Sequence, residues 1–161
     1  MADSVAFTGV SKAARYAELV PQIAALVDGE PDLIANLANV AAAVRQCLPI
    51  ASWVGWYVRR GEELVLGPFQ GNVACVRIKL GRGVCGTAAA ERRTLIVDDV
   101  AQFPGHIACD AGSRSEIVVP VMRDGEAIAV LDVDSYALAA FDGDDAAGLA
   151  RVVEVVSALA W

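Results

Sequence analysis

The sequence predicts an α+β fold, in which N- and C-terminal helices pack on one face of a central, mostly antiparallel sheet. Three observations support this prediction. Apolar residues recur at helical spacing towards both ends, the middle is a run of strand-like segments, and Asp124-Gly125 marks a tight hairpin between two of them. Because the chain has 161 residues and shows no internal repeat or linker, one domain is expected.

Helical spacing of apolar residues marks three long segments. They cover residues 11–27, 31–48 and 142–160, after a loose arm over residues 1–10. In the second segment, Pro31 suits a helical first turn. Cys47 falls near the end of this segment and is interpreted as a small buried hydrophobe. These helices are expected to form the layer that covers the sheet.

The segments between the long helices are rich in β-branched and aromatic residues, which is typical of strands. They cover residues 52–58, 64–69, 73–80, 94–97, 116–122 and 127–135. The glycines at 81 and 83 end the third of these segments, and a short helix is expected to begin at Cys85. A loop rich in Gly, Asp and Ser is expected over residues 98–115.

Composition excludes several classes of function. A net charge of −7 argues against nucleic-acid binding, because phosphates require a basic surface. No apolar run approaches the roughly 18 residues of a membrane span. Lys12, Arg15 and Glu18 interrupt the stretch that a secretory signal would keep apolar, so a cytoplasmic protein is expected.

Four cysteines stand out in a chain expected in a reducing compartment, where thiols are more often catalytic, metal-binding or buried than paired. They are Cys47, Cys75, Cys85 and Cys109. His106 lies three residues before Cys109, so a site of three cysteines and one histidine for zinc is conceivable. Structural zinc sites, however, use closely spaced ligand pairs that this sequence lacks. No metal is therefore expected, and His106 is interpreted as hydrogen-bonding within its loop.

The surroundings of the last three cysteines differ. Cys85 begins a helix, where the helix dipole and the nearby Arg82 favour a thiolate. Cys109 lies in a glycine-bearing loop, where it can move and meet solvent, whereas Cys75 lies in an apolar segment and is expected to be the most buried. This pattern favours redox chemistry over metal binding. Three buried structural cysteines are the alternative.

Two carboxylates, Asp132 and Asp134, lie two residues apart on an expected strand and therefore point to the same face. Aspartate is rare within strands, so either this strand end is solvated or both groups serve a site. Like charges this close raise the pKa of at least one of them, which suits an acid that must donate a proton.

The face occupied by a third carboxylate, Glu116, depends on the hairpin register. A strict two-residue loop would pair Glu116 with Val133 and turn it away from the aspartates. An odd-length loop, or a bulge near Pro120, would bring all three carboxylates to one face. The second arrangement is the prediction.

Trp53 and Tyr57 are four residues apart on a strand and share a face, with Gly55 between them leaving room. The two rings are interpreted either as a core pair or as an aromatic wall for a small ligand that carries a methyl or thioether group.

Long segments of this chain resemble the free methionine-(R)-sulfoxide reductases, which are single GAF domains. These are LVLGPFQGNVACVRIKLGRGVCGTA, GHIACDAGSRSEIVVP and LDVDS, and SWVGWY fits the aromatic strand of that family. The resemblance covers roughly residues 30–160 and implies a GAF domain over residues 11–161. Trp56 stands where a different aromatic residue is expected, and Cys47 lies outside the family pattern.

The resemblance also implies an enzyme that reduces free L-methionine-(R)-sulfoxide. It implies that Cys109 is the nucleophile, that Cys85 resolves the resulting sulfenic acid and that Cys75 is an auxiliary thiol. An external dithiol, thioredoxin in this family, would recycle the disulfide, with no metal or other cofactor. A homodimer is the family expectation.

The resemblance assigns the remaining site residues to substrate binding and proton transfer. Glu116 and Asp134 would receive the α-ammonium group, and Asp132 would assist at the sulfoxide oxygen. Trp53 and Tyr57 would bound the pocket of the side chain. Two rival functions stay open, a GAF module that binds a small ligand and a redox sensor without catalysis.

Overall fold

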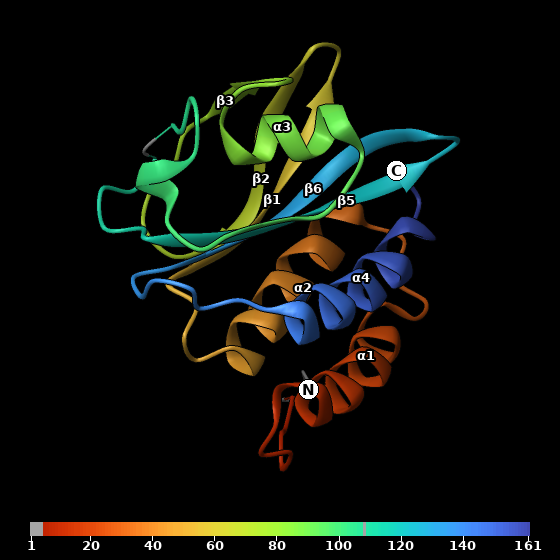
Figure 1. Ribbon diagram of the computed structural model, residues 1–161. Helices are drawn as coiled ribbons and strands as arrows, with labels where there is room; N and C mark the ends of the chain where they lie inside the picture. Colours follow the sequence, from red (N-terminus) through yellow and green to blue (C-terminus); the bar gives the residue numbers. More distant parts are fainter. Residues whose placement is uncertain (1–4, 108) are drawn as a thin grey trace.

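The computed structural model describes residues 5–107 and 109–161 and contains one six-stranded sheet between two helical layers (Figure 1). Residues 1–4 of the expected arm and Ala108 lie outside the described residues. The strands are β1 (Trp53–Arg60), β2 (Glu63–Gln70), β3 (Arg77–Lys79), β4 (Leu95–Val97), β5 (Ser115–Arg123) and β6 (Glu126–Ser135). They pair antiparallel in the order β3-β2-β1-β6-β5-β4. The predicted α+β class is confirmed.

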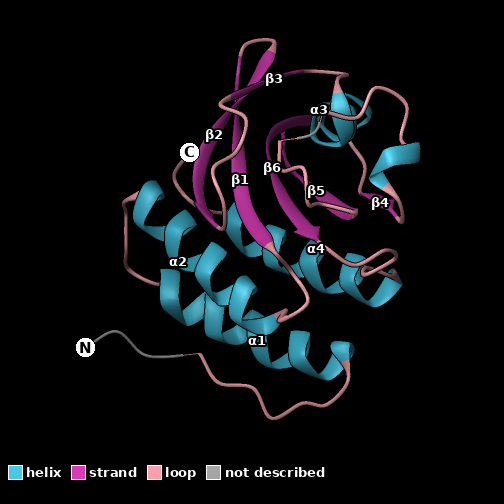
Figure 2. Cartoon of the chain, turned by 90° about the vertical axis from the view of Figure 1, so that its left-hand side faces the viewer, coloured by secondary structure: helices cyan, strands magenta, loops and turns pink. Residues whose placement is uncertain are grey.

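The expected helices form and cover one face of the sheet. They are α1 (Lys12–Val27), α2 (Leu33–Cys47) and α4 (Gly143–Ser157), with α2 and α4 against the strands and α1 packed on these two helices (Figure 2). A shorter helix, α3 (Gly83–Glu91), lies on the opposite face, and the 3-10 turn η1 (Val100–Gln102) interrupts the loop before β5 (Figure 1). None of the helices in the described residues combines the length and apolar character that a bilayer span requires.

Two details near the N-terminus differ from the sequence-based expectations. The α2 helix starts after Asp32, whose carboxylate accepts the Ala35 N–H at 2.8 Å, so Pro31 precedes the helix and is not in its first turn. The described part of the expected loose arm is tied to α1, because Thr8 N–H and hydroxyl both donate to Glu18.

The sheet separates two apolar cores. The larger lies between the sheet and α1, α2 and α4, and contains Trp56, whose indole N–H donates to the Leu37 carbonyl at 2.9 Å. Cys47 is fully buried there, as expected, and burial raises its pKa to about 11. The smaller core lies under α3. Trp53, Tyr57 and Cys85 belong to this second core, which makes it the side of the sheet that carries the site.

The hairpin of β5 and β6 contains a bulge that determines the register of the carboxylates. Its turn residues, Asp124 and Gly125, have φ values of 51° and 80°, as a type I′ turn requires. Val121 pairs with Ala129 while the next residue pairs with Ala127, so Ile128 is an extra residue on β6. Beyond the bulge the pairing is shifted by one position. Of the two ways considered to bring the carboxylates to one face, the structure has the bulge, and the predicted arrangement is confirmed.

Candidate functional site

A cavity between α3, the sheet and the loop before β5 collects most of the residues singled out from the sequence. Eight of them line it, namely Trp53, Tyr57, Cys85, His106, Cys109, Glu116, Asp132 and Asp134. Of the expected segment 73–80, only Arg77–Lys79 is a strand, and the residues before it form a loop that carries Cys75 and lines the cavity with Val73 and Ala74.

The three carboxylates form a buried cluster on one face of the hairpin. Glu116 pairs directly with Asp134, while Asp132 pairs with Val118 and therefore points to the same side. Burial, followed by the charges of the two aspartates, raises the pKa of Glu116 well above its usual value. Burial also raises the pKa of Asp132 to about 7, and burial with the charge of Asp132 raises that of Asp134. Such a cluster is suited to hold a cationic group or to donate a proton.

Cys85 lies against this cluster as a thiol. It is the third residue of α3 and only 4% exposed, and its Sγ donates to Glu116 Oε1 at 3.7 Å. Burial and the nearby carboxylates raise its pKa well above the usual value. The expectation of a Cys85 thiolate is therefore wrong, because desolvation outweighs the helix dipole and Arg82 is exposed to solvent. Cys85 is also more buried than Cys75, contrary to expectation.

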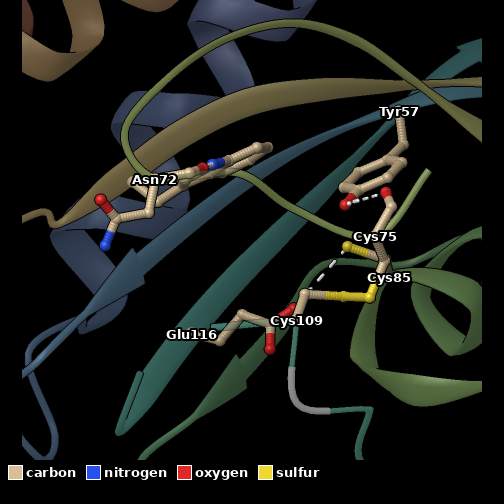
Figure 3. Close-up of a disulfide and its surroundings, with 7 residues drawn as sticks. Tyr57, Asn72, Cys75, Cys85, Cys109 and Glu116 are labelled. Carbon is tan, nitrogen blue, oxygen red and sulfur yellow. Dashed lines mark hydrogen bonds between the residues drawn. A yellow bond between two sulfur atoms is a disulfide. The ribbon is translucent and has the colours of Figure 1, made fainter. Parts of the chain in front are cut away.

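A disulfide joins Cys75 to Cys109, with their Cα atoms 5.2 Å apart (Figure 3). The resemblance had implied a bond between Cys109 and Cys85, but Cys85 is a free thiol here. The Cys75 loop crosses next to the Cys109 loop, and the Tyr57 hydroxyl donates to the Cys75 carbonyl at 3.0 Å. Because Cys75 and Cys109 are bonded to each other, the conceivable zinc site of His106 and three cysteines is not formed. Another set of possible ligand atoms, from Cys85 and two carboxylates, lies within 4.8 Å.

Trp53 and Tyr57 form a stacked wall of the cavity. Their ring centroids are 6.0 Å apart, and Phe69, which no sequence pattern marks as a site residue, stacks on Trp53 at 5.3 Å between ring centroids. Gly55 leaves the room for this arrangement, since a Cβ there would overlap the Trp53 ring and the Phe69 Cβ. Both rings are buried in the smaller core and also line the cavity, so the two interpretations do not exclude each other.

Three polar residues missed from the sequence connect the two cysteine loops. Asp110 Oδ2 accepts hydrogen bonds from the Tyr136 hydroxyl at 2.9 Å and from Asn72 Nδ2 at 3.3 Å. Asn72 Nδ2 also donates to the Tyr136 oxygen at 3.0 Å. The adjacency of Asp110 to Cys109 is the one signal that the sequence offered. Asn72 lies three residues before Cys75 but no spacing pattern marks it, and Tyr136 comes from a distant segment, directly after β6.

His106 lines the same cavity, and its expected local hydrogen bond is not made by Nδ1. Its backbone N–H donates to the Phe103 carbonyl at 3.1 Å. Its Nδ1 atom is buried and has no hydrogen-bond partner within residues 5–107 and 109–161. Burial lowers the pKa of the imidazole, which favours the neutral ring.

Residues 30–159 match the GAF domain family. The chain is 50% identical over 157 residues to GAF domain-containing protein A of Dictyostelium discoideum, covering 97% of this chain and 99% of that protein. It is 46% identical over 144 residues to free methionine-R-sulfoxide reductase of Escherichia coli strain K12, covering 89% of this chain and 87% of that protein.

The backbone shows the same relationship. The crystal structure of free methionine-R-sulfoxide reductase from Neisseria meningitidis, in complex with its substrate, superposes with a TM-score of 0.93 at 48% identity. The superposition covers 96% of this chain and 93% of that one. The similarity therefore extends over both layers of the fold and over the strands that carry the site.

Proposed function

The chain belongs to the GAF-domain family of free methionine-(R)-sulfoxide reductases, and we propose that it reduces free L-methionine-(R)-sulfoxide through the thiol of Cys109. The observation that carries the thiol mechanism is a single cavity in which a disulfide-forming cysteine faces three buried carboxylates and an aromatic wall. The carboxylates suit an amine and a proton transfer. The wall suits a methyl sulfoxide.

Glu116 and Asp134 are the proposed ligands of the substrate's α-ammonium group. Their carboxylates are paired across the hairpin and buried, so each gains from a cation that neutralises the cluster. The thioether end would lie against Trp53 and Tyr57. Methionine inside a peptide has an amide in place of the ammonium group, and the cluster would reject it.

The reaction transfers the sulfoxide oxygen to the cysteine. A thiolate at Cys109 attacks the sulfoxide sulfur, and a proton from Asp132 helps the oxygen to leave that sulfur. The pKa of Asp132, about 7, is suited to a proton donor near neutral pH. The oxygen then bonds to the Cys109 sulfur as the transient bond between the two sulfur atoms breaks, so methionine leaves with the two electrons that Cys109 has lost and Cys109 becomes a sulfenic acid.

The second half of the cycle regenerates the thiol. Cys75 attacks the Cys109 sulfenic acid, water leaves and the disulfide forms. The Cys75–Cys109 bond supports Cys75 in this role, in place of Cys85. An external dithiol of the thioredoxin type would then reduce the bond by exchange. The scheme requires neither a metal nor a nucleotide.

We propose a cytoplasmic protein, because a cycle that ends in a disulfide depends on a strong supply of reduced dithiols. The proposed assembly is a homodimer, in line with the family, and the exposed sides of the N-terminal helices are the proposed contact surface.

The reduced protein is incubated with a dithiol and either the R or the S epimer of free methionine sulfoxide, in separate reactions. We expect methionine from the R epimer alone and none from Cys109→Ser. Cys47→Ala is the matched control, because Cys47 lies in the other core and should leave turnover intact. Binding of the R epimer without its consumption would favour the ligand-sensing alternative.

A further inference from the structure

The cavity contains an excess of acidic groups and one side chain that can carry a positive charge. Its titratable residues besides His106 and the disulfide are Tyr57 on β1, Cys85 on α3, Asp110 in the loop before β5, Glu116 on β5, and Asp132 and Asp134 on β6. Neither lysine nor arginine is among the described residues that line it. A ligand with a carboxylate would be repelled by most of this wall.

The proposed substrate has such a carboxylate, attached to the same carbon as the ammonium group. When the ammonium group meets Glu116 and Asp134, the substrate carboxylate is held within a few bonds of them. It therefore needs a hydrogen-bond donor on the facing side of the cavity, because a buried anion without one is strongly disfavoured. Two donors of the aromatic wall are engaged elsewhere, since Trp53 Nε1 binds the Asn72 carbonyl and Tyr57 binds that of Cys75.

His106 has a buried ring nitrogen, Nδ1, that lacks a hydrogen-bond partner in the described part of the chain. An unsatisfied buried polar atom is costly. The residue lies in the loop that carries Cys109 and lines the same cavity as the acidic cluster of the hairpin. A ligand atom with a negative charge would satisfy Nδ1.

Resting on the proposed function, we propose that His106 is a specificity-determining residue that binds the α-carboxylate of the free amino acid. Glu116 and Asp134 then recognise the amine end and His106 the acid end, and the site requires both. The neutral ring donates from Nδ1, and an approaching carboxylate also stabilises the protonated ring. The site therefore selects free methionine sulfoxide by both its ammonium group and its carboxylate.

The kinetic test compares free L-methionine-(R)-sulfoxide with L-methioninamide-(R)-sulfoxide, which keeps the ammonium group and lacks the carboxylate. The unmodified protein should prefer the free acid by about 10-fold or more in kcat/KM, mainly through KM. His106→Ala should bring this ratio close to one, whereas His106→Asn should retain part of it, because the asparagine amide can donate from a similar position.

Ser113→Ala tests the rival donor, since the Ser113 hydroxyl lines the same cavity and is also buried without a hydrogen-bond partner in the described residues. The preference for the free acid should survive this change. If His106→Ala keeps the preference, or if Ser113→Ala removes it, the assignment is overturned.

A second measurement does not depend on turnover. The chain has a single histidine, so one set of imidazole signals reports His106 in an NMR titration with pH. In Cys109→Ser, free methionine sulfoxide should raise the imidazole pKa, and the amide should leave it unchanged. Equal effects of the two ligands would refute the carboxylate contact. Failure of the proposed function would instead appear as no methionine from either sulfoxide with the unmodified protein.

Discussion

Glu116 of β5 lies directly opposite Asp134 of β6, and this pairing exists because Ile128 bulges out of the partner strand. Without the extra residue, the two-residue turn would place Glu116 opposite Val133 and direct it into the larger core. The acidic side of the cavity therefore depends on one residue at the far end of the hairpin.

Burial of this cluster predicts that Asp132→Asn stabilises the ligand-free protein above neutral pH. The pKa of Asp132 is raised from 3.8 to about 7. Its protonated carboxyl therefore contributes fully to the stability of the fold below the unfolded pKa, and this contribution is lost as pH rises through the folded pKa and the buried group ionises. The gain over the unmodified protein should be small near pH 4 and reach roughly 2–4 kcal/mol above about pH 7.

Urea unfolding at about pH 4 and about pH 8 measures this gain. Glu154→Gln, at an exposed carboxylate on α4, is the control and should show no comparable rise with pH. An Asp132→Asn variant that is equally stable relative to the unmodified protein at both pH values would contradict the prediction.

The disulfide predicts different behaviour for the two candidate resolving cysteines. Cys75→Ser should produce one methionine per chain and then stall as a Cys109 sulfenic acid, which a sulfenic-acid probe and mass spectrometry would detect. Cys85→Ser should still form the Cys75–Cys109 bond and turn over with thioredoxin, because Cys85 lies against Glu116 and outside that bond. The reverse pattern would restore Cys85 as the resolving residue.

Close packing of the aromatic wall predicts that Gly55→Ala weakens both fold and substrate binding. The added methyl would overlap the Trp53 ring and the Phe69 Cβ, which cannot both move without opening the wall. We expect a loss of about 1–3 kcal/mol in the free energy of unfolding, and a raised KM. Gly143→Ala is the control, because a Cβ there meets open space. An unchanged KM in Gly55→Ala would remove Trp53 from the substrate wall.

The hydrogen bonds among Asp110, Tyr136 and Asn72 predict a selective effect of Tyr136→Phe. The ring would stay packed near Gly112 while its contacts with Asp110 and Asn72 are lost. The two cysteine loops are then held together less tightly, so disulfide formation should slow while the first methionine is released at the original rate. Rapid quenching with separate measurement of methionine and free thiols tests this. Slowing of both steps would show a general disturbance of the site.

Short-range patterns were sufficient for most of the fold. The spacing of apolar residues located α1, α2 and α4, because a helix that covers a sheet must keep one apolar face. Alternation and turn residues located the hairpin, and two aspartates on one face of its second strand pointed to a site. The boundaries of α2 and β3 were less accurate, because side-chain capping and strand pairing decided them.

By itself, the sequence determined the fold class, the acidic strand and the cysteines that merit attention, since these depend on residue type and local period. Only the tertiary structure decided which cysteine bonds to Cys109, that Cys85 is a buried thiol, and that His106 meets the acidic cavity. Those properties depend on which distant loops cross and on how much water they exclude. Desolvation is a property of the packed whole, so no local pattern around Cys85 could reveal its raised pKa.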